Sequence, residues 1–363
     1  MEIRDEQTYV FADELHRFVR EILTKVGVTE NDAGIVADVL NAADLRGIDS
    51  HGIARLRRYV DGIRHGKIEA HSHTVTLLNG PATVALDACN GLGQPAAVTA
   101  MRMAIAKAEE FGIGMVTLRR SNHFGIASYY AMMALEHGMI GIATTNASPQ
   151  VAPTFGAQAM YGTNPIAVAI PTGGPTPFVL DMATSTVPRG KLERLQREGS
   201  TIPQGWAIDG DGFPITNLKE LIKGLVERRE YALLPLGGMG ELFGGHKGFG
   251  LGLLVDLLCG PLTGSAWGRH VYGPNGANLG QCFIALRPDC FRMHEEFKQD
   301  SEQLLHEIRS ARKIQGQEII YIPGDKEAKE AERRRDMGIP LKNTVLQELD
   351  KLANEVGITF LGG

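Results

Sequence analysis

Short runs of strand-forming residues between positions 74 and 183 constrain the fold more than any other feature of the sequence. Turn-forming residues separate these runs, which cover 83–86, 114–118, 140–143, 166–170 and 178–180. Helical patterns over 96–111 and 126–137 fill only the first two gaps. Two parallel strands need a crossover connection of a dozen or more residues. The segments that join the last three runs are too short to form such a connection. The sequence therefore predicts an α/β (α+β-like) chain with a mixed, largely antiparallel sheet.

Helical patterns flank this region on both sides. Thr29, with Asp32 three residues later, predicts the start of one helix, and Ser50 predicts the start of a second. The second helix would bury a stripe at positions 53, 56, 60 and 63. Towards the C-terminus the pattern alternates between helix, a strand over 318–322, and helix. The mixed charges of 329–336 predict a solvated helix face.

The overall charge gives no reason to expect a nucleic acid or an anionic membrane as a partner. Lys plus Arg number 37 against 42 acidic residues, for a formal net charge of -5. No apolar run approaches membrane-spanning length, and residues 1–6 lack the character of a leader, so we expect a cytoplasmic protein. The four cysteines show no C-x-x-C spacing and are expected to be reduced thiols.

The segment from Asp49 to Tyr59 gathers three side chains that could bind and oxidise a hydroxy acid. On the predicted helix His51, Arg55 and Tyr59 stand four residues apart and share one face. A guanidinium can clamp a carboxylate through two hydrogen bonds, while imidazole and phenol can exchange protons. The alternative is an ordinary solvated helix face.

A second candidate is Ser121-Asn122-His123-Phe124-Gly125, where a strand is predicted to turn into a helix. Histidine can take a hydroxyl proton near neutral pH, since its unperturbed pKa is about 6.5, and glycine lets the chain turn sharply beside a ligand. The alternative is a histidine whose hydrogen bonds are purely structural.

Small polar residues in the turns 146–149, 161–165 and 181–185 suit the ribose and phosphates of a nucleotide, although each segment alone fits an ordinary turn. A fourth segment, 244–251, opens an apolar helix with Lys247 beside its first backbone N–H groups. That arrangement binds phosphate or substrate, or simply allows close packing. It is not a Walker A loop, because no Ser or Thr follows the lysine.

Two other interpretations are disfavoured by what is missing. Residues 91–96 match G-x-G-x-x-A, but Arg119 and Arg120 stand where a Rossmann fold places an acidic residue. His71 and His73 could join His51 and His123 in a metal site, yet no glutamate or cysteine completes a recognisable ligand set. We therefore expect neither a Rossmann fold nor a bound metal.

Taken together, these segments resemble the type 2 malate/L-lactate dehydrogenase family in both order and spacing, over nearly the whole chain. Several motifs in register are far more specific than any one of them. The matching motifs are Asp49-Ser50-His51-Gly52, Ser121-Asn122-His123-Phe124-Gly125, Tyr161-Gly162-Thr163-Asn164-Pro165, Asp181-Met182-Ala183-Thr184-Ser185, Gly245-His246-Lys247-Gly248-Phe249-Gly250 and Pro323-Gly324-Asp325.

The resemblance implies a homodimer, a non-Rossmann dinucleotide-binding fold and helical flanking units. It matches His123 to the family's acid/base histidine and His51 to a second histidine credited with proton transfer in some members. Arg55 and Tyr59 match substrate-binding positions, with Arg55 taking the carboxylate. The matched cofactor positions are Asn146, Thr163, Asn164, Asp181, Met182, Ala183, Lys247, Gly324 and Asp325.

We accordingly expect three units. Residues 1–73 with 288–363 would form a helical substrate and dimerisation unit, and residues 74–186 with 244–287 the cofactor-binding mixed-sheet unit. The polar residues 187–243 would form a small appended unit.

The implied reaction transfers a hydride between NAD and a small 2-hydroxy acid. (S)-Malate is the expected substrate, because Ala277 stands where ureidoglycolate-oxidising relatives carry an arginine. L-Sulfolactate, L-lactate and ureidoglycolate remain alternative substrates, and a non-catalytic dinucleotide-binding protein is the alternative of a different class. NADP is an alternative to NAD, since Arg189 could bind its 2'-phosphate. Asp325 or Glu327 would repel that phosphate, which favours NAD.

Overall fold

The computed structural model describes residues 7–197, 199–226, 231–274 and 276–360. The first six residues, on which the prediction of a missing leader rests, lie outside these ranges. Within them, no helix combines the length and the apolar character that a bilayer span requires.

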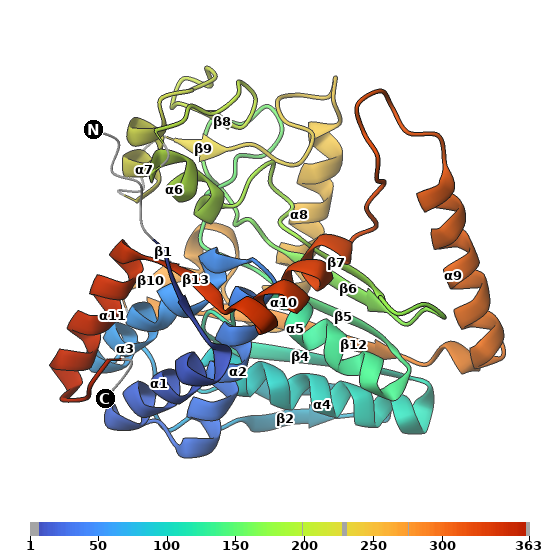
Figure 1. Ribbon diagram of the computed structural model, residues 1–363, viewed down its shortest axis with the longest axis horizontal. Helices are drawn as coiled ribbons and strands as arrows, with labels where there is room; N and C mark the ends of the chain where they lie inside the picture. Colours follow the sequence, from blue (N-terminus) through green and yellow to red (C-terminus); the bar gives the residue numbers. More distant parts are fainter. Residues whose placement is uncertain (1–6, 198, 227–230, 275, 361–363) are drawn as a thin grey trace.

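One seven-stranded sheet forms the centre of the molecule (Figure 1). Its strand order is β2-β3-β4-β12-β5-β6-β7, and only β3 and β4 pair in parallel. The predicted mixed, largely antiparallel sheet is thus confirmed. The strands are β2 (Val75–Asn79), β3 (Thr83–Asp87), β4 (Ile113–Ser121), β5 (Ile140–Thr145), β6 (Ile166–Ile170), β7 (Phe178–Met182) and β12 (Leu279–Leu286).

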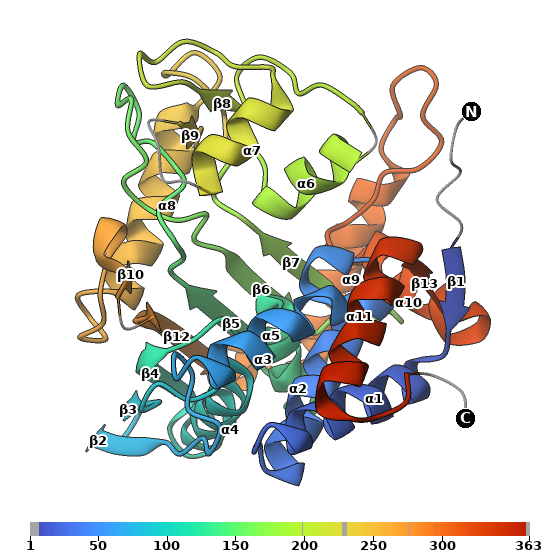
Figure 2. The same ribbon diagram turned by 90° about the vertical axis from the view of Figure 1, so that its left-hand side faces the viewer.

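Helices cover both faces of this sheet, because its central strands bury alternate side chains on each side. On β12, Phe283 packs in the core formed with α4 (Gly93–Phe111) and α5 (Ala127–Met133). Its neighbour Cys282 packs against Val255 of α8 (Gly245–Cys259). Figure 2 shows these layers from the side.

A separate helical unit joins the two ends of the chain (Figure 2). It contains α1 (Ala12–Lys25), α2 (Glu30–Leu45), α3 (Leu56–Arg64) and α11 (Asn343–Val356), with β1 (Gln7–Val10) paired to β13 (Ile339–Lys342). Leu15, Ile22, Leu40 and Leu352 are fully buried in its core. The predicted cap of α2 is confirmed, since the Asp32 N–H donates to the Thr29 hydroxyl.

Smaller elements complete the fold. The stretch after β7 carries α6 (Arg189–Arg197), β8 (Ala207–Ile208), α7 (Leu218–Val226) and β9 (Ala232–Leu233). A short hairpin, β10 (Tyr272–Gly273) and β11 (Gly276–Ala277), precedes β12. The helices α9 (His294–Ser310) and α10 (Asp325–Met337) follow it, with α9 at the edge of the molecule in Figure 1.

Two predictions from the C-terminal pattern are wrong. Residues 318–322 form no strand, because they do not pair with the sheet. The chain first bonds to the sheet at Pro323, whose carbonyl accepts a hydrogen bond from the Val179 N–H of β7. The face of α10 is not fully solvated either: Arg334 is buried and bonds to the carbonyl of Asp44 and the carboxylate of Asp49.

Candidate active site

Several of the predicted polar segments lie at one edge of the sheet. Because β4 and β5 both run antiparallel to β12, and β6 antiparallel to β5, the ends of β4 and β5 lie at the same edge as the starts of β12 and β6. The end of β7 also reaches this edge. The antiparallel register therefore brings together segments that lie far apart in the sequence.

A cavity of about 460 Å³ lies at this edge, under the helical unit and the small elements after β7. Among its lining residues are His51, Arg55, Arg58, His123, Phe124, Gly125, Thr145, Asn146, Ser148, Gln150, Thr163, Arg189, Tyr272 and Leu279. The volume and the mixture of apolar walls with a few polar groups are typical of small-molecule sites.

His123 enters the cavity from the loop that joins β4 to α5. Its Nδ1 lies 2.8 Å from the Tyr59 hydroxyl and 3.4 Å from the backbone nitrogen of Gly125. Gly125 has a φ of 84°, and a Cβ there would come within 2.5 Å of the side chain of Val39. Glycine is therefore required for this turn.

His51 lies beside His123 in the lining of the cavity, although not on the predicted helix. The two rings stack with centroids 5.5 Å apart. Residues 49–51 and 53–55 form two short 3₁₀ turns, and α3 begins only at Leu56. The prediction that these residues share one helix face is thus wrong. Ser50 caps no helix, and its hydroxyl lies 2.9 Å from His51 Nδ1. Tyr59 is fully buried together with the apolar residues of α3.

This geometry breaks the helix because a buried carboxylate lies against Gly52. The Asp44 side chain accepts a 2.7 Å hydrogen bond from the Ile53 N–H, and a Cβ on Gly52 would come within 1.7 Å of it. Arg334 donates to the Asp44 carbonyl and to the Asp49 carboxylate. Burial, far more than the nearby Asp49, raises the pKa of Asp44 to about 8.

Both histidines are neutral in this environment. Burial, with smaller contributions from Arg55 and Arg58, lowers the pKa of His51 to about 4. Burial also lowers the pKa of His123 well below its ordinary value, helped by Arg58, His51 and Arg55. Burial raises the pKa of Tyr59 to about 12, so its hydroxyl keeps its proton. A neutral imidazole can accept a proton, which a general base must do.

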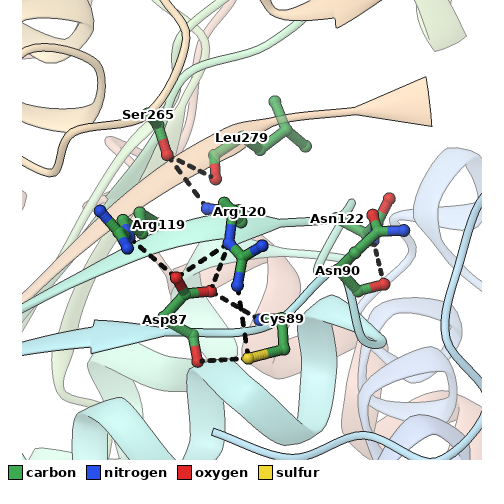
Figure 3. Close-up of polar contacts among 8 residues, drawn as sticks. All are labelled: Asp87, Cys89, Asn90, Arg119, Arg120, Asn122, Ser265 and Leu279. Carbon is green, nitrogen blue, oxygen red and sulfur yellow. Dashed lines mark hydrogen bonds and ion pairs between the residues drawn. The ribbon is translucent and has the colours of Figure 1, made fainter. Parts of the chain in front are cut away.

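An ion-pair cluster lies at the end of β4, directly before the loop that carries His123 (Figure 3). Asp87, at the end of β3, accepts hydrogen bonds from Arg119 and Arg120. Burial raises the pKa of Asp87, but the bonds from Arg120, the Cys89 N–H and Arg119 bring it below the ordinary value. Beside this cluster the Asn122 amide donates to the carbonyls of Asn90 and Gly91.

Two of the residues predicted to bind a cofactor, Asn146 and Thr163, line the cavity. Asn146 is buried and donates to Asp256 and to the Ala266 carbonyl. Asn164, just behind the wall, accepts from the Ala147 N–H and donates to the Gly252 carbonyl. These side-chain bonds hold the two turns in shape.

The other predicted cofactor residues lie outside the lining of this cavity. Asp181 and Met182 end β7 and Ala183 follows it; the Asp181 carboxylate accepts a hydrogen bond from the Ser128 N–H at the start of α5. Lys247 lines a second cavity at the start of α8. Gly324 precedes α10, and Asp325 lines a third cavity between α9 and α10, where it pairs with Arg309.

Sequence reasoning missed Arg58 and Tyr272. Arg58 follows Arg55 by three residues at the start of α3, and its Nη2 donates to the Tyr272 hydroxyl over 2.6 Å. The run Arg55-Leu56-Arg57-Arg58 was a signal for Arg58, because residues three apart share a helix side. Tyr272 comes from the hairpin before β12, and no local pattern marks it. No group of three or more potential metal ligands occurs in the described part of the chain.

Comparison with known proteins extends over almost the whole chain. The model of the family described as malate/L-lactate dehydrogenase matches residues 10–350. A malate dehydrogenase of Pyrococcus abyssi is 49% identical over 351 residues, covering 96% of this chain and 95% of the relative. An L-sulfolactate dehydrogenase of Methanocaldococcus jannaschii is 38% identical over 348 residues, covering 95% of this chain and 96% of the relative.

The fold agrees with the sequence comparison. The solved structure of malate dehydrogenase from Pyrococcus horikoshii superposes with a TM-score of 0.90 at 44% identity, covering 99% of this chain and 98% of the other.

Proposed function

Because the chain belongs to the malate/L-lactate dehydrogenase family and is thus a 2-hydroxy-acid dehydrogenase, we propose that it oxidises (S)-malate to oxaloacetate with NAD. The observation that carries this proposal is the cavity in which two neutral histidines face Arg55 and Arg58. A base for a hydroxyl proton thus lies beside cations for carboxylates. The name of the Pyrococcus abyssi relative favours malate among the 2-hydroxy acids.

The residues at the sheet edge fit a nicotinamide dinucleotide by their chemistry. Asn146 and Thr163 offer polar groups, Phe124 and Leu279 offer apolar surface to a ring, and Arg189 offers a cation to a phosphate. We assign the cofactor to this edge together with Asn164, Asp181, Met182, Ala183, Lys247, Gly324 and Asp325. NAD is preferred to NADP because Asp325 and Glu327 carry negative charge near the start of α10.

A bound nicotinamide supplies the acceptor for the hydride that leaves C2 of the substrate. The protein supplies the base, and we assign that role to His123, with His51 as the second candidate. When the Nδ1–H of His123 donates to the Tyr59 oxygen, Nε2 is free to take the hydroxyl proton. This transfer leaves an imidazolium with protons on both Nδ1 and Nε2, which returns the Nε2 proton to the keto oxygen in the reverse reaction.

Arg55 is proposed to hold the C1 carboxylate. Its Nε donates to the Ser50 carbonyl, which fixes the guanidinium beside His51 at the cavity wall. A guanidinium forms two parallel bonds to a carboxylate, so it orients the substrate as well as attracting it. Orientation places the C2 hydroxyl for proton transfer.

We further propose a cytoplasmic homodimer. The four cysteines are free thiols. Four leucines of α8, at positions 251, 253, 254 and 257, are exposed, and an apolar face of this kind favours association with a second copy. Analytical ultracentrifugation tests the dimer, and a monomer at micromolar concentration would contradict it.

The substrate and the cofactor are tested by initial rates of reduced-nicotinamide formation. We expect malate with NAD to give the highest kcat/KM among malate, lactate, sulfolactate and ureidoglycolate, each with NAD and NADP. A higher value for sulfolactate would replace malate as the substrate, a possibility raised by the Methanocaldococcus jannaschii relative. A preference for NADP would reassign Arg189 to a 2'-phosphate.

A further inference from the structure

The cavity carries more positive charge than one carboxylate requires. Arg55, Arg58 and Arg189 line it, and no aspartate or glutamate occurs among the described residues of its wall. A 2-hydroxy acid with a single carboxylate needs one guanidinium clamp. With Arg55 assigned to that carboxylate and Arg189 to a cofactor phosphate, Arg58 is the arginine of this lining to which no anion has yet been assigned.

Arg58 is the residue best placed to meet such a group. It lies three residues beyond Arg55 on the same side of the chain, and both guanidinium groups act electrostatically on His51 and His123. The Tyr272 hydroxyl accepts a 2.6 Å bond from its Nη2, which ties one end of the guanidinium to the hairpin wall. The side chain is thus held at the cavity by a neutral partner, which leaves its charge uncompensated by that bond.

We propose that Arg58 binds the distal anionic group of the substrate and so makes the enzyme selective for dianionic 2-hydroxy acids. The inference rests on the proposed function, because it assumes that Arg55 holds the C1 carboxylate. A carboxylate or a sulfonate can accept hydrogen bonds from the Arg58 guanidinium, whereas the methyl group of lactate cannot. Specificity then arises because only a substrate with a second anion gains a charge-assisted hydrogen bond to the Arg58 guanidinium.

The chain offers a matched control for this proposal. Arg57, the neighbour of Arg58 on α3, donates to Glu355 of α11 over 2.8 Å and is absent from the cavity lining. Arg57→Gln and Arg58→Gln make the same change in net charge at adjacent positions. Only Arg58→Gln should change how the protein distinguishes anions.

The first test compares kcat/KM for malate and lactate in the wild type and both variants. Loss of a charge-assisted contact predicts a fall of about ten- to a hundredfold for malate in Arg58→Gln, with lactate changed less than about threefold. Arg58→Lys should retain more activity on malate than Arg58→Gln because it keeps the charge. Arg57→Gln should keep the wild-type ratio of the two substrates.

The second test needs no turnover of the poorer substrate. Succinate and butanoate have the same chain length but differ by one carboxylate, so the ratio of their inhibition constants against malate measures recognition of the second anion. We expect this ratio to collapse towards one in Arg58→Gln and to persist in Arg57→Gln. Equal losses on malate and lactate, or an unchanged inhibitor ratio, would overturn the role of Arg58 while leaving malate oxidation intact. If the wild-type protein oxidised neither malate nor lactate, the proposed function itself would be refuted.

Discussion

The two histidines of the cavity are carried by very different segments. We call the loop after β4 the His123 wall and the two 3₁₀ turns before α3 the His51 wall. His123 follows a central strand, and its loop is held by the Asp87 cluster and by the Asn122 amide bonds. His51 sits on two short 3₁₀ turns, whose position depends on the buried Asp44 and on Arg334. Bonds from several residues around β3 and β4 hold the loop of the first histidine, whereas the turns that carry the second depend on the buried side chains of Asp44 and Arg334. We expect the His51 wall to be the more sensitive to substitution behind the site.

The largest expected effect distinguishes the chemical roles of the two walls. His123→Ala should lower kcat for malate oxidation by about a hundredfold or more, because the base for the hydroxyl proton is lost. Affinity for the dinucleotide, measured by fluorescence titration, should change little. His51→Ala should cost less in kcat. The reverse order of the two variants would move the base to the His51 wall.

The next effect concerns the support of the His51 wall. Asp44→Ala removes the acceptor of the Ile53 N–H, and a buried donor without a partner costs about 1–3 kcal/mol. We expect a lower Tm and a kcat/KM for malate reduced by about tenfold, because Arg55 and His51 lose their position. The KM for the dinucleotide should be nearly unchanged. A fall in apparent kcat with both KM values unchanged would instead indicate a smaller folded fraction.

The pH dependence of stability in Asp44→Asn tests the role of the buried Asp44 side chain separately from its bond to the Ile53 N–H. The folded-state pKa of Asp44, about 8, lies above its ordinary value, so the folded protein binds the extra proton more tightly than the unfolded chain does. This contribution to stability is present at low pH and is lost as pH rises through about 8. Asparagine resembles the neutral acid, so Asp44→Asn should fold well at pH 7. Denaturant unfolding at pH 6 to 9 should show a smaller alkaline decline than in the wild type.

A smaller effect is expected behind the His123 wall. Asp87→Asn breaks the ion pairs of a buried carboxylate with Arg119 and Arg120, whose side chains are 36% and 51% exposed. Solvent screening of the two arginines keeps the expected loss to about 1 kcal/mol. Because the Asn122 bonds remain, kcat should fall by less than about threefold. A loss larger than that of Asp44→Ala would break the comparison between the two walls.

The smallest expected change is a shift in the pH profile. Arg58 contributes to the lowered pKa of both histidines, so its replacement by glutamine should raise them. Activity that needs a neutral base is lost as pH falls through that pKa. The acid limb of kcat/KM should therefore move to higher pH in Arg58→Gln and stay in place in Arg57→Gln. An unmoved limb in both variants would mean that Arg58 does not act on the base.

The sequence predicted the sheet because strand periods follow from local pattern, whereas the cofactor residues were expected from the family resemblance. Strand periods, and gaps too short for crossover helices, were enough to exclude a parallel sheet. The helix expected from Ser50 was wrong, since the buried Asp44 that interrupts it lies on α2 and is invisible to periodicity. Tyr272 was missed for the same reason: its bond to Arg58 joins residues 214 positions apart.

The central claim is that a dianionic 2-hydroxy acid reacts between the two walls. A crystal structure of the unreactive complex with malate and NADH tests this most directly. We predict the C1 carboxylate on Arg55, the distal carboxylate on Arg58 and the C2 hydroxyl within hydrogen-bond distance of His123. Malate bound beside Lys247 or Asp325, or in the cavity with its hydroxyl remote from both histidines, would contradict the account.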